Sequence, residues 1–402
     1  MIACPDCGLL EELPRLGAGT NAVCQLCEAV LERTRGRSLA AGLGCSLATF
    51  LLLIPSNLFP LLGVTIFGMH NQARLGTGVF MLWDHGWILL AALIAAFAVV
   101  LPFIRFGLLS AVLGVIVLGY RPAWLGRGFR WAGWLDVWAM PDVFLLAFFV
   151  GYFRLVHVTQ MSVRIGPGGY CFLTTALLAM VSRAAIDRRT VWRAIAPEAE
   201  LPENREAISC TVCDLVQPVT AEGRHCPRCS AQLYARRPFA ILRATAFTAA
   251  ALLLFFPANF LPMNTSVQIG SRVDYTIFRG VQELYKAGLW PIGIIIFCAS
   301  IGIPALKILV MGWLVLSIRR RSRAHLVFKT KCHRFVNEIG RWSNVDPFTI
   351  AVFVPLMTFG PLASSHAAWG STAFIAVVVL TLLASMSFDP RLLWDAAEGT
   401  RT

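Results

Sequence analysis

Eight of the twelve cysteines fall into four Cys-x-x-Cys pairs, a spacing that lets two thiolates bind one metal ion. The first two pairs are separated by 16 residues and the last two by 12 residues. Two pairs supply four thiolates, which is the full tetrahedral ligand set of a structural Zn²⁺ site. The sequence therefore predicts two zinc sites, one formed by Cys4, Cys7, Cys24 and Cys27 and the other by Cys210, Cys213, Cys226 and Cys229.

Two other chemistries use the same residues. Four thiolates can hold a rubredoxin-like iron, and a Cys-x-x-Cys pair can act as a redox dithiol. A closed set of four thiolates leaves no open coordination position for a substrate, so we expect a structural metal. His225 lies beside Cys226, and we interpret it as a neighbour of the site, because four thiolates already complete it.

Ionisable residues within apolar runs form the second group with possible chemistry. Lys307 lies roughly 12 residues, or about 18 Å of helix, inside the run 289–318. A charge at that depth usually faces a partner or a water-filled cavity. Asp346 begins the next run, with Ser343 three residues before it, and Ser300 lies two helical turns before Lys307. This pattern predicts a polar network that relays protons or gates a path.

Simpler interpretations of these residues remain open. Asp346 followed by a proline is also typical of a helix N-cap, and Lys307 could extend its ammonium toward the membrane surface. Thr381, in the middle of the last run, could join the network or bond to its own helix backbone. The first half of the chain has Arg105 and Asp142 at the matching positions. Because arginine does not deprotonate, we expect that half to be more structural and the second half more active.

The composition indicates that membrane-spanning helices position these residues. The 402 residues are 57% hydrophobic and only 14% charged, with a mean hydropathy of +0.67, whereas a soluble domain has roughly 25% charged residues. The apolar residues form long runs, which indicates an all-α polytopic membrane protein. Eight spans are expected, at 39–62, 87–120, 137–153, 170–186, 239–262, 289–318, 345–358 and 373–388.

The chain contains the same unit twice, at an offset of 202 to 204 residues. The sequence Pro-x-Asn-x-x-Pro closes the first run of each unit, at Pro55 and at Pro257. An even number of spans in each unit gives both copies the same orientation. The expected domains are a zinc ribbon (1–37), a four-helix membrane domain (38–190), a linker with a second ribbon (191–237), and a second four-helix membrane domain with a short tail (238–402).

The net charge of +13 is distributed as in a membrane protein. Loops on the cysteine side carry 23 Lys and Arg residues, and the opposite loops carry 5. By the positive-inside rule both cysteine clusters and both termini are expected in the cytoplasm. Basic residues in short loops between spans do not indicate nucleic-acid binding. The sequence also contains no Walker loop, HExxH motif, nucleophile elbow or dinucleotide fingerprint, so we do not expect an enzyme.

Several of these motifs together resemble the paraquat-inducible protein A (PqiA/LetA) family. They are the tandem four-cysteine heads, the Pro-x-Asn-x-x-Pro ends, Trp342-Ser343-Asn344-Val345-Asp346 and Ser387-Phe388-Asp389-Pro390-Arg391. The resemblance implies a bacterial inner-membrane protein that works with a periplasmic MCE-domain tunnel protein and moves phospholipids between the two membranes. It also implies tandem zinc ribbons. One departure is Cys210-Thr211-Val212-Cys213, which lacks the proline or glycine often found after the first thiolate.

Three functions follow as hypotheses. The first is a lipid transporter in which the polar network couples transport to protons. The second is a non-transporting anchor that docks the tunnel protein, and the third is a thiol or metal redox sensor. The lipid species, the direction of transport, the energy source and the oligomeric state are left open by the sequence.

Overall fold

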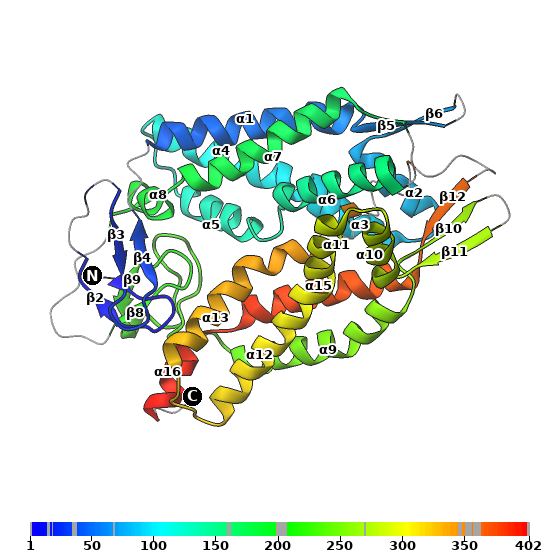
Figure 1. Ribbon diagram of the computed structural model, residues 1–402. Coiled ribbons are helices and arrows are strands. Elements are labelled where there is room, and N and C mark those ends of the chain that lie inside the picture. The colour runs from blue at the N-terminus through cyan, green and yellow to red at the C-terminus, as the bar shows by residue number, and fades with distance from the viewer. Residues whose placement is uncertain are drawn as a thin grey trace.

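The computed structural model describes residues 2–13, 17, 19–33, 38–66, 69–158, 162–197, 207–268, 271–344, 348–349, 356 and 363–399. Long helices fill the middle of the molecule, and the cysteine-bearing segments lie together at one end, where both marked chain ends also lie (Figure 1). Two small β-sheets form the opposite end. The polarity of the two halves is therefore the same, as a parallel repeat requires.

The two halves contain the same elements in the same order. Repeat one contains α1 (Leu39–Leu58), β5 (Leu62–Ile66), β6 (Met69–Ala73), α2 (Leu75–Asp84), α3 (Ile88–Ala95), α4 (Leu101–Val117), α5 (Leu125–Leu135), α6 (Pro141–Phe153), β7 (Ser162–Ile165), α7 (Pro167–Ala185) and α8 (Arg188–Ile195). Repeat two contains α9 (Ala240–Phe260), β10 (Asn264–Gln268), β11 (Ser271–Tyr275), α10 (Ile277–Lys286), α11 (Trp290–Phe297), α12 (Ile303–Arg319), α13 (Leu326–Ile339), β12 (Ala363–Ala367), α15 (Trp369–Ser387) and α16 (Arg391–Glu398).

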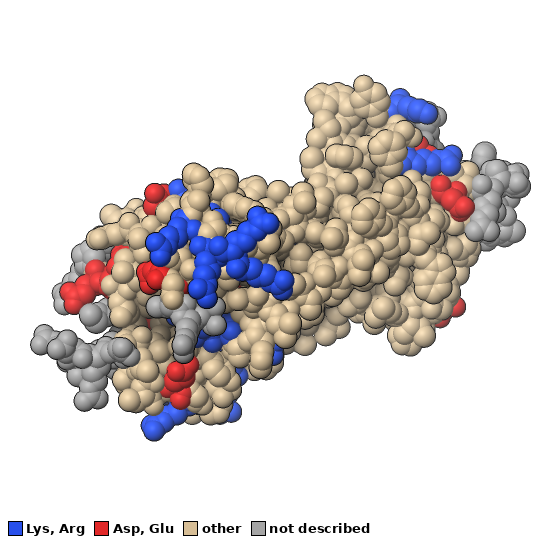
Figure 2. Space-filling view, turned by 90° about the horizontal axis from the view of Figure 1, so that it is seen from below, with Lys and Arg blue, Asp and Glu red and all other residues tan. Residues whose placement is uncertain are grey.

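Five helical stretches in the described part of the chain are long and apolar enough to cross a membrane: Leu39–Leu58, Ile88–Val117, Ala240–Phe260, Trp290–Arg319 and Trp369–Ser387. A sixth results if α7 and α8, which meet at 65°, count as one broken span. One face of the molecule carries its charges at the two ends, with an uncharged belt between them (Figure 2). The chain is thus a mostly helical, multi-pass membrane protein.

The count of eight spans stays a prediction. The expected span 137–153 corresponds to α6, which has 13 residues and continues into a π-helical turn at Arg154–Val158. The expected span 345–358 lies almost entirely outside the described residues.

Strands make the fold less purely helical than expected. The segments 63–86 and 263–287, which lie between expected spans, form antiparallel hairpins followed by α2 and α10. A third strand completes each sheet, in the orders β6-β5-β7 and β11-β10-β12. Each sheet draws its third strand from just before α7 or α15, so the sheets tie the outer ends of helices that are distant in sequence.

The Pro-x-Asn-x-x-Pro ends have one structural role in both repeats. The side chains of Asn57 and Asn259 each donate to the backbone carbonyl four residues earlier, at 2.7 Å. The asparagine thereby bonds a carbonyl in the turn that the proline weakens. Gly370 lies so close to this end that an added Cβ would be 2.5 Å from the carbonyl oxygen of Pro262. The motif thus sets a close contact between two helices.

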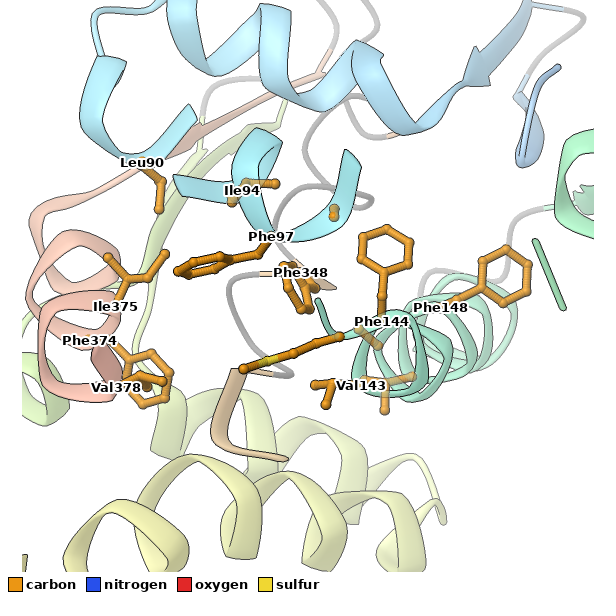
Figure 3. Packing of buried hydrophobic residues seen from close by; sticks show 14 of the residues in the cluster. Leu90, Ile94, Phe97, Val143, Phe144, Phe148, Phe348, Phe374, Ile375 and Val378 are labelled. Carbon is orange, nitrogen blue, oxygen red and sulfur yellow. The ribbon is translucent and has the colours of Figure 1, made fainter. Parts of the chain in front are cut away.

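The two repeats meet in a core of aromatic and aliphatic side chains. Phe144 of α6 and Phe348, four residues past the last 3₁₀ turn of repeat two, have ring centroids 5.2 Å apart. Figure 3 shows Phe348 near Phe97 of repeat one, and Phe374 of α15 belongs to the same buried cluster. Phe144 and Phe348 occupy equivalent positions, because each follows the repeated tryptophan by six residues. The repeats therefore contact each other through matching surfaces.

Each of the two longest helical stretches contains a π-helical turn at the same place. These turns are Ala96–Val100 and Cys298–Gly302, and each is followed directly by a segment with proline at its second residue. A π-turn inside an α-helix changes the direction of the side chains around it and is frequent at functional sites. Arg105 and Lys307 follow these turns at equivalent positions.

Candidate functional sites

The four Cys-x-x-Cys pairs adopt one turn geometry. In each pair the residue after the second cysteine donates its backbone N–H to the carbonyl of the first cysteine. That residue has a left-handed backbone in all four turns, at Gly8, Glu28, Asp214 and Ser230. Such a turn places both sulfur atoms of a pair on the same side of the turn. Short antiparallel strands flank three of the turns: β1–β2 (Ile2–Ala3, Leu10–Glu11), β3–β4 (Asn21–Val23, Val30–Arg33) and β8–β9 (Ala207–Ser209, Val216–Pro218).

The sulfur atoms converge into two buried clusters. The distances from Cys4 to Cys27 and from Cys7 to Cys24 are 3.4 and 3.6 Å, and the two matching distances in the second cluster are both 3.5 Å. All four sulfurs of each cluster lie within 4.8 Å of one another. A tetrahedral ion with bonds of about 2.3 Å would separate its sulfur ligands by about 3.8 Å. Both clusters could therefore hold a metal ion, and each brings together the four cysteines that the sequence grouped.

The packing of the two heads is crossed relative to the sequence. The first head (described residues 2–33) shares a hydrophobic core with α12 and α16 of repeat two, including Leu314 and Trp394. The second head (207–237) shares a core with α5 and α8 of repeat one, including Phe129 and Trp192. An added Cβ at Gly126 of α5 would lie 1.8 Å from the carbonyl oxygen of Arg228, so this contact is very close. Each head therefore supports the membrane helices of the other half.

Polar contacts fix the first head between the repeats. Arg334 of α13 donates to the carbonyl oxygen of Cys27 at 2.7 Å and pairs with Asp6 at 2.8 Å. Arg193 of α8 in repeat one forms a two-point ion pair with Glu32 of the same head, at 2.7 and 2.8 Å. Bidentate pairs of this kind define orientation as well as position. The first head therefore has polar contacts with both repeats.

Lys307 is a buried cation of repeat two. Its side chain is fully buried, and its ammonium donates to the carbonyl oxygen of Gly340 at 3.4 Å. Gly340 begins a 3₁₀ turn, Gly340–Asn344, that packs against α12, α15 and the π-turn at Cys298–Gly302. An added Cβ at Gly340 would lie 2.9 Å from the lysine Nζ, so the glycine makes room for the ammonium.

Hydroxyl groups lie on the elements around this lysine. Ser343 donates to the same Gly340 carbonyl at 2.8 Å, and Thr381 donates to the carbonyl of Val378 in its own helix at 2.9 Å. Ser300, in the π-turn, is buried, and its hydroxyl has no hydrogen-bond partner within the described part of the chain. Asp346, the expected partner of Lys307, lies outside the described residues.

Repeat one has charges in the corresponding place. Arg105 pairs with Asp136 at 2.5 Å, and Asp142 pairs with Arg183 at 2.7 Å. Arg183 also bonds Asp136 at 2.8 Å, so it links the two carboxylates. Arg105 and Asp142 could be singled out from the sequence, whereas Asp136 and Arg183 were not expected at this site. An arginine inside the apolar run 170–186 was the signal that could have identified Arg183.

Aligning the elements of the two repeats shows what differs. Asp136 of repeat one corresponds to Gly340, because both follow the helix before the repeated tryptophan by one residue. Arg183 corresponds to Ser385. The three hydroxyl residues of repeat two correspond to alanines in repeat one: Ser300 to Ala98, Ser343 to Ala139 and Thr381 to Ala179. At the positions of repeat two that the structure describes, Lys307 and hydroxyl groups thus stand where repeat one has paired charges and alanines.

Comparison with known proteins agrees with this duplicated architecture. The family model described as paraquat-inducible protein A matches the chain twice, over residues 39–196 and 241–398. The chain belongs to the paraquat-inducible protein A family. The two matched segments coincide with the two repeats and leave the cysteine heads outside them.

Relatives within the paraquat-inducible protein A family cover nearly the full chain. The intermembrane transport protein PqiA of Escherichia coli K12 is 31% identical over 98% of this chain and 95% of its own length. The lipophilic envelope-spanning tunnel protein A of the same organism is 28% identical over 98% of this chain and 91% of its own length. A probable intermembrane transport protein of Haemophilus influenzae is 26% identical over 98% of this chain. No solved structure matches the chain.

Proposed function

We propose that this protein transports phospholipids between the bacterial inner membrane and a periplasmic tunnel protein with MCE domains, and that protons drive the transfer. The names of its relatives describe intermembrane transport and an envelope-spanning tunnel, which supports transport and not catalysis. The observation that carries the proposal is the fully buried Lys307 in a repeat whose counterpart has its charges paired.

The proton-coupling step involves this repeat's own residues. Among the described residues the ammonium bonds one carbonyl, and exchange of a proton with the carboxylate of Asp346 would let the lysine gain and lose its charge. Ser300, Ser343 and Thr381 supply hydroxyls on the three elements around it, and Asp346 is the proposed carboxylate partner. Arg105 and Asp142 belong to the structural counterpart in repeat one. Loss of the lysine proton would change the packing of α12 against the 3₁₀ turn and so alter access for the lipid.

The heads complete the proposed architecture. Each cluster holds one Zn²⁺ as a structural ion. The first ribbon occupies residues 1–37, and a linker with the second ribbon occupies 191–237. The membrane domains are 38–190 and 238–402, the latter with a short tail. Eight spans place both heads and both termini in the cytoplasm, which follows from the excess of Lys and Arg on that side. In the reducing cytoplasm the thiolates remain available to the metal.

Purification with the tunnel protein tests the function and the metal together. Mass spectrometry of the purified complex should find phospholipid and two zinc ions per chain. Replacing Cys7 with Ser should reduce the zinc content to one ion per chain. Labile metal, or disulfides that form reversibly under mild oxidant, would favour the redox-sensor hypothesis instead.

Transfer of a fluorescent phospholipid from proteoliposomes to the tunnel protein separates a transporter from an anchor. Lys307→Ala and Asp346→Asn should abolish transfer while tunnel binding persists. Wild-type transfer rates in both variants would contradict the coupling proposal, and loss of tunnel binding in step with transfer would favour the anchor.

A further inference from the structure

His333 is a buried titratable residue that the proposed network does not include. It lies on α13, and its side chain is 8% exposed. Its ring packs against Phe388, with centroids 5.0 Å apart, and it hydrogen-bonds to the backbone of Ser385 on α15. Its Nε2 atom has no hydrogen-bond partner within the part of the chain that the structure describes.

His333 lies two helical turns before Gly340, the residue whose carbonyl accepts the hydrogen bond from Lys307. His333 and Gly340 are seven residues apart, two helical turns, so they lie on the same side of α13 about 10 Å apart along its axis. Gly340 accepts the hydrogen bond from Lys307, and α13 approaches it from the basic, cysteine-side loop. His333 therefore lies between that loop and the buried lysine.

Hydroxyl groups occupy the same interval on α15. Ser385, whose backbone bonds the histidine, is one helical turn from Thr381. Both hydroxyls donate to carbonyls of their own helix, Ser385 to Leu382 and Thr381 to Val378, and both are buried. Polar groups thus continue from His333 toward the level of Lys307 along two packed helices.

Repeat one has no titratable residue at this position. His333 corresponds to Phe129, because His333 precedes Gly340 by seven residues and Phe129 precedes the equivalent Asp136 by seven residues. Phe129 is buried and packs edge-on against Trp192, with ring centroids 4.9 Å apart. An aromatic ring of similar size therefore satisfies the packing of this site, so packing alone does not require histidine in repeat two.

We propose that His333 carries protons between Lys307 and the cytoplasm, an inference that rests on the proposed function. In this step the N–H bond of the lysine ammonium breaks and a proton reaches the imidazole through intervening water. The lysine becomes neutral and the imidazole becomes imidazolium. The imidazolium then gives its proton to cytoplasmic water, and the ring returns to its neutral form.

The charges that face His333 favour this release. Arg237, which precedes α9, and Arg334 on its own helix oppose protonation, whereas Asp389, which follows α15, favours it. Burial is the largest influence and lowers the pKa of His333 to about 4. At neutral pH the imidazole is consequently neutral, with a lone pair to accept a proton and little tendency to keep it.

The full-length protein in proteoliposomes of phosphatidylethanolamine and phosphatidylglycerol tests the relay. A trapped pH-sensitive dye reports the proton flux that follows an imposed pH gradient. His333→Phe, which adopts the repeat-one residue, should fold and reduce the flux about tenfold or more. His333→Gln keeps a hydrogen bond but carries no proton, and it should be equally slow. His70→Phe, an exposed histidine in β6, is the matched control and should leave the flux unchanged.

Chemical rescue separates proton transfer from a structural role. Added imidazole should restore flux to His333→Ala and not to Lys307→Ala. If His333→Gln conducts as the wild type does, or if imidazole does not rescue His333→Ala, the relay is overturned. Normal flux in His333→Phe with loss in Lys307→Ala would overturn the relay alone, and normal flux in both would also overturn proton coupling.

Discussion

The two repeats share one backbone plan and differ in how they treat buried charge. Repeat one holds Arg105, Arg183, Asp136 and Asp142 in a connected set of ion pairs. Repeat two has Lys307 bonded to a backbone carbonyl, with hydroxyls where repeat one has alanines. Paired ions hold each other in one protonation state, whereas an amine that bonds one carbonyl among the described residues is stabilised less. This difference supports the proposal that one copy is structural and that the other copy carries the proton chemistry.

The largest expected effect concerns the ion pairs of repeat one. Arg183→Ala would leave the buried carboxylate of Asp142 without the cation that bonds it at 2.7 Å. Breaking one side of a buried pair costs about 3–5 kcal/mol, so the unfolding temperature in detergent should fall sharply. The matched change in repeat two, Ser385→Ala, removes only a hydroxyl and should leave it nearly unchanged. Equal stability of the two variants would show that repeat one is not held by its charges.

The stability of the wild type should depend on pH more strongly than that of His333→Phe, which has the repeat-one residue at this position. The folded pKa of His333 is lowered to about 4 by burial, below the value of 6.5 expected in the unfolded chain. The unfolded chain therefore binds more protons between these values, and stability from the neutral histidine is present above pH 6.5 and is lost as the pH falls toward 4. The loss should approach about 2–3 kcal/mol. In thermal melts across this range, His333→Phe should show a flatter profile than the wild type; a parallel profile would argue against a buried neutral histidine.

A substitution at Gly340 can place the residue of repeat one, Asp136, at the equivalent position of repeat two. Gly340→Asp places a carboxylate where repeat one has Asp136, next to the lysine ammonium. The new ion pair should keep Lys307 charged and lower lipid transfer about tenfold. Gly340→Ala displaces the ammonium without adding charge and serves as the steric control. Undiminished transfer in Gly340→Asp would mean that Lys307 does not need to lose its proton.

The smallest effects belong to the hydroxyls. Ser300→Ala, Ser343→Ala and Thr381→Ala each install the residue of repeat one, so folding should be unaffected. Each should slow lipid transfer by roughly two- to tenfold, because removal of one hydrogen bond changes a barrier by about 0.5–1.5 kcal/mol. Ser343→Ala is expected to have the clearest effect, since its hydroxyl donates to the same Gly340 carbonyl as the Lys307 ammonium. A triple variant with wild-type kinetics would remove these hydroxyls from the mechanism.

Much of this arrangement could be predicted from the sequence because its signals are local. Cys-x-x-Cys spacing groups the thiolates, and apolar runs with a repeated Pro-x-Asn-x-x-Pro end mark the duplicated helices. Lys307 and Arg105 could be singled out because a charge in an apolar run is rare. The constant offset between the copies also identified Lys307 and Arg105 as equivalent positions of the two repeats.

The parts that could not be predicted depend on tertiary contacts. The first head packs on repeat two and the second on repeat one, which no residue near either head encodes. Arg105 pairs with Asp136, which lies one residue before the expected span 137–153. The strands β7 and β12 pair with hairpins that are distant in sequence. Gly340 carried no chemical signal at all, since its role is to leave room for Lys307 and to offer a carbonyl.

One measurement tests the difference between the repeats most directly: lipid transfer from proteoliposomes by Lys307→Met compared with Arg105→Met, each normalised to the amount of folded protein. Methionine keeps most of the side-chain volume and removes the charge in both cases. The account predicts that Lys307→Met abolishes transfer and that folded Arg105→Met retains most of it. Equal activity of the two variants, whether both are active or both inactive, would contradict a division between a structural and a working repeat.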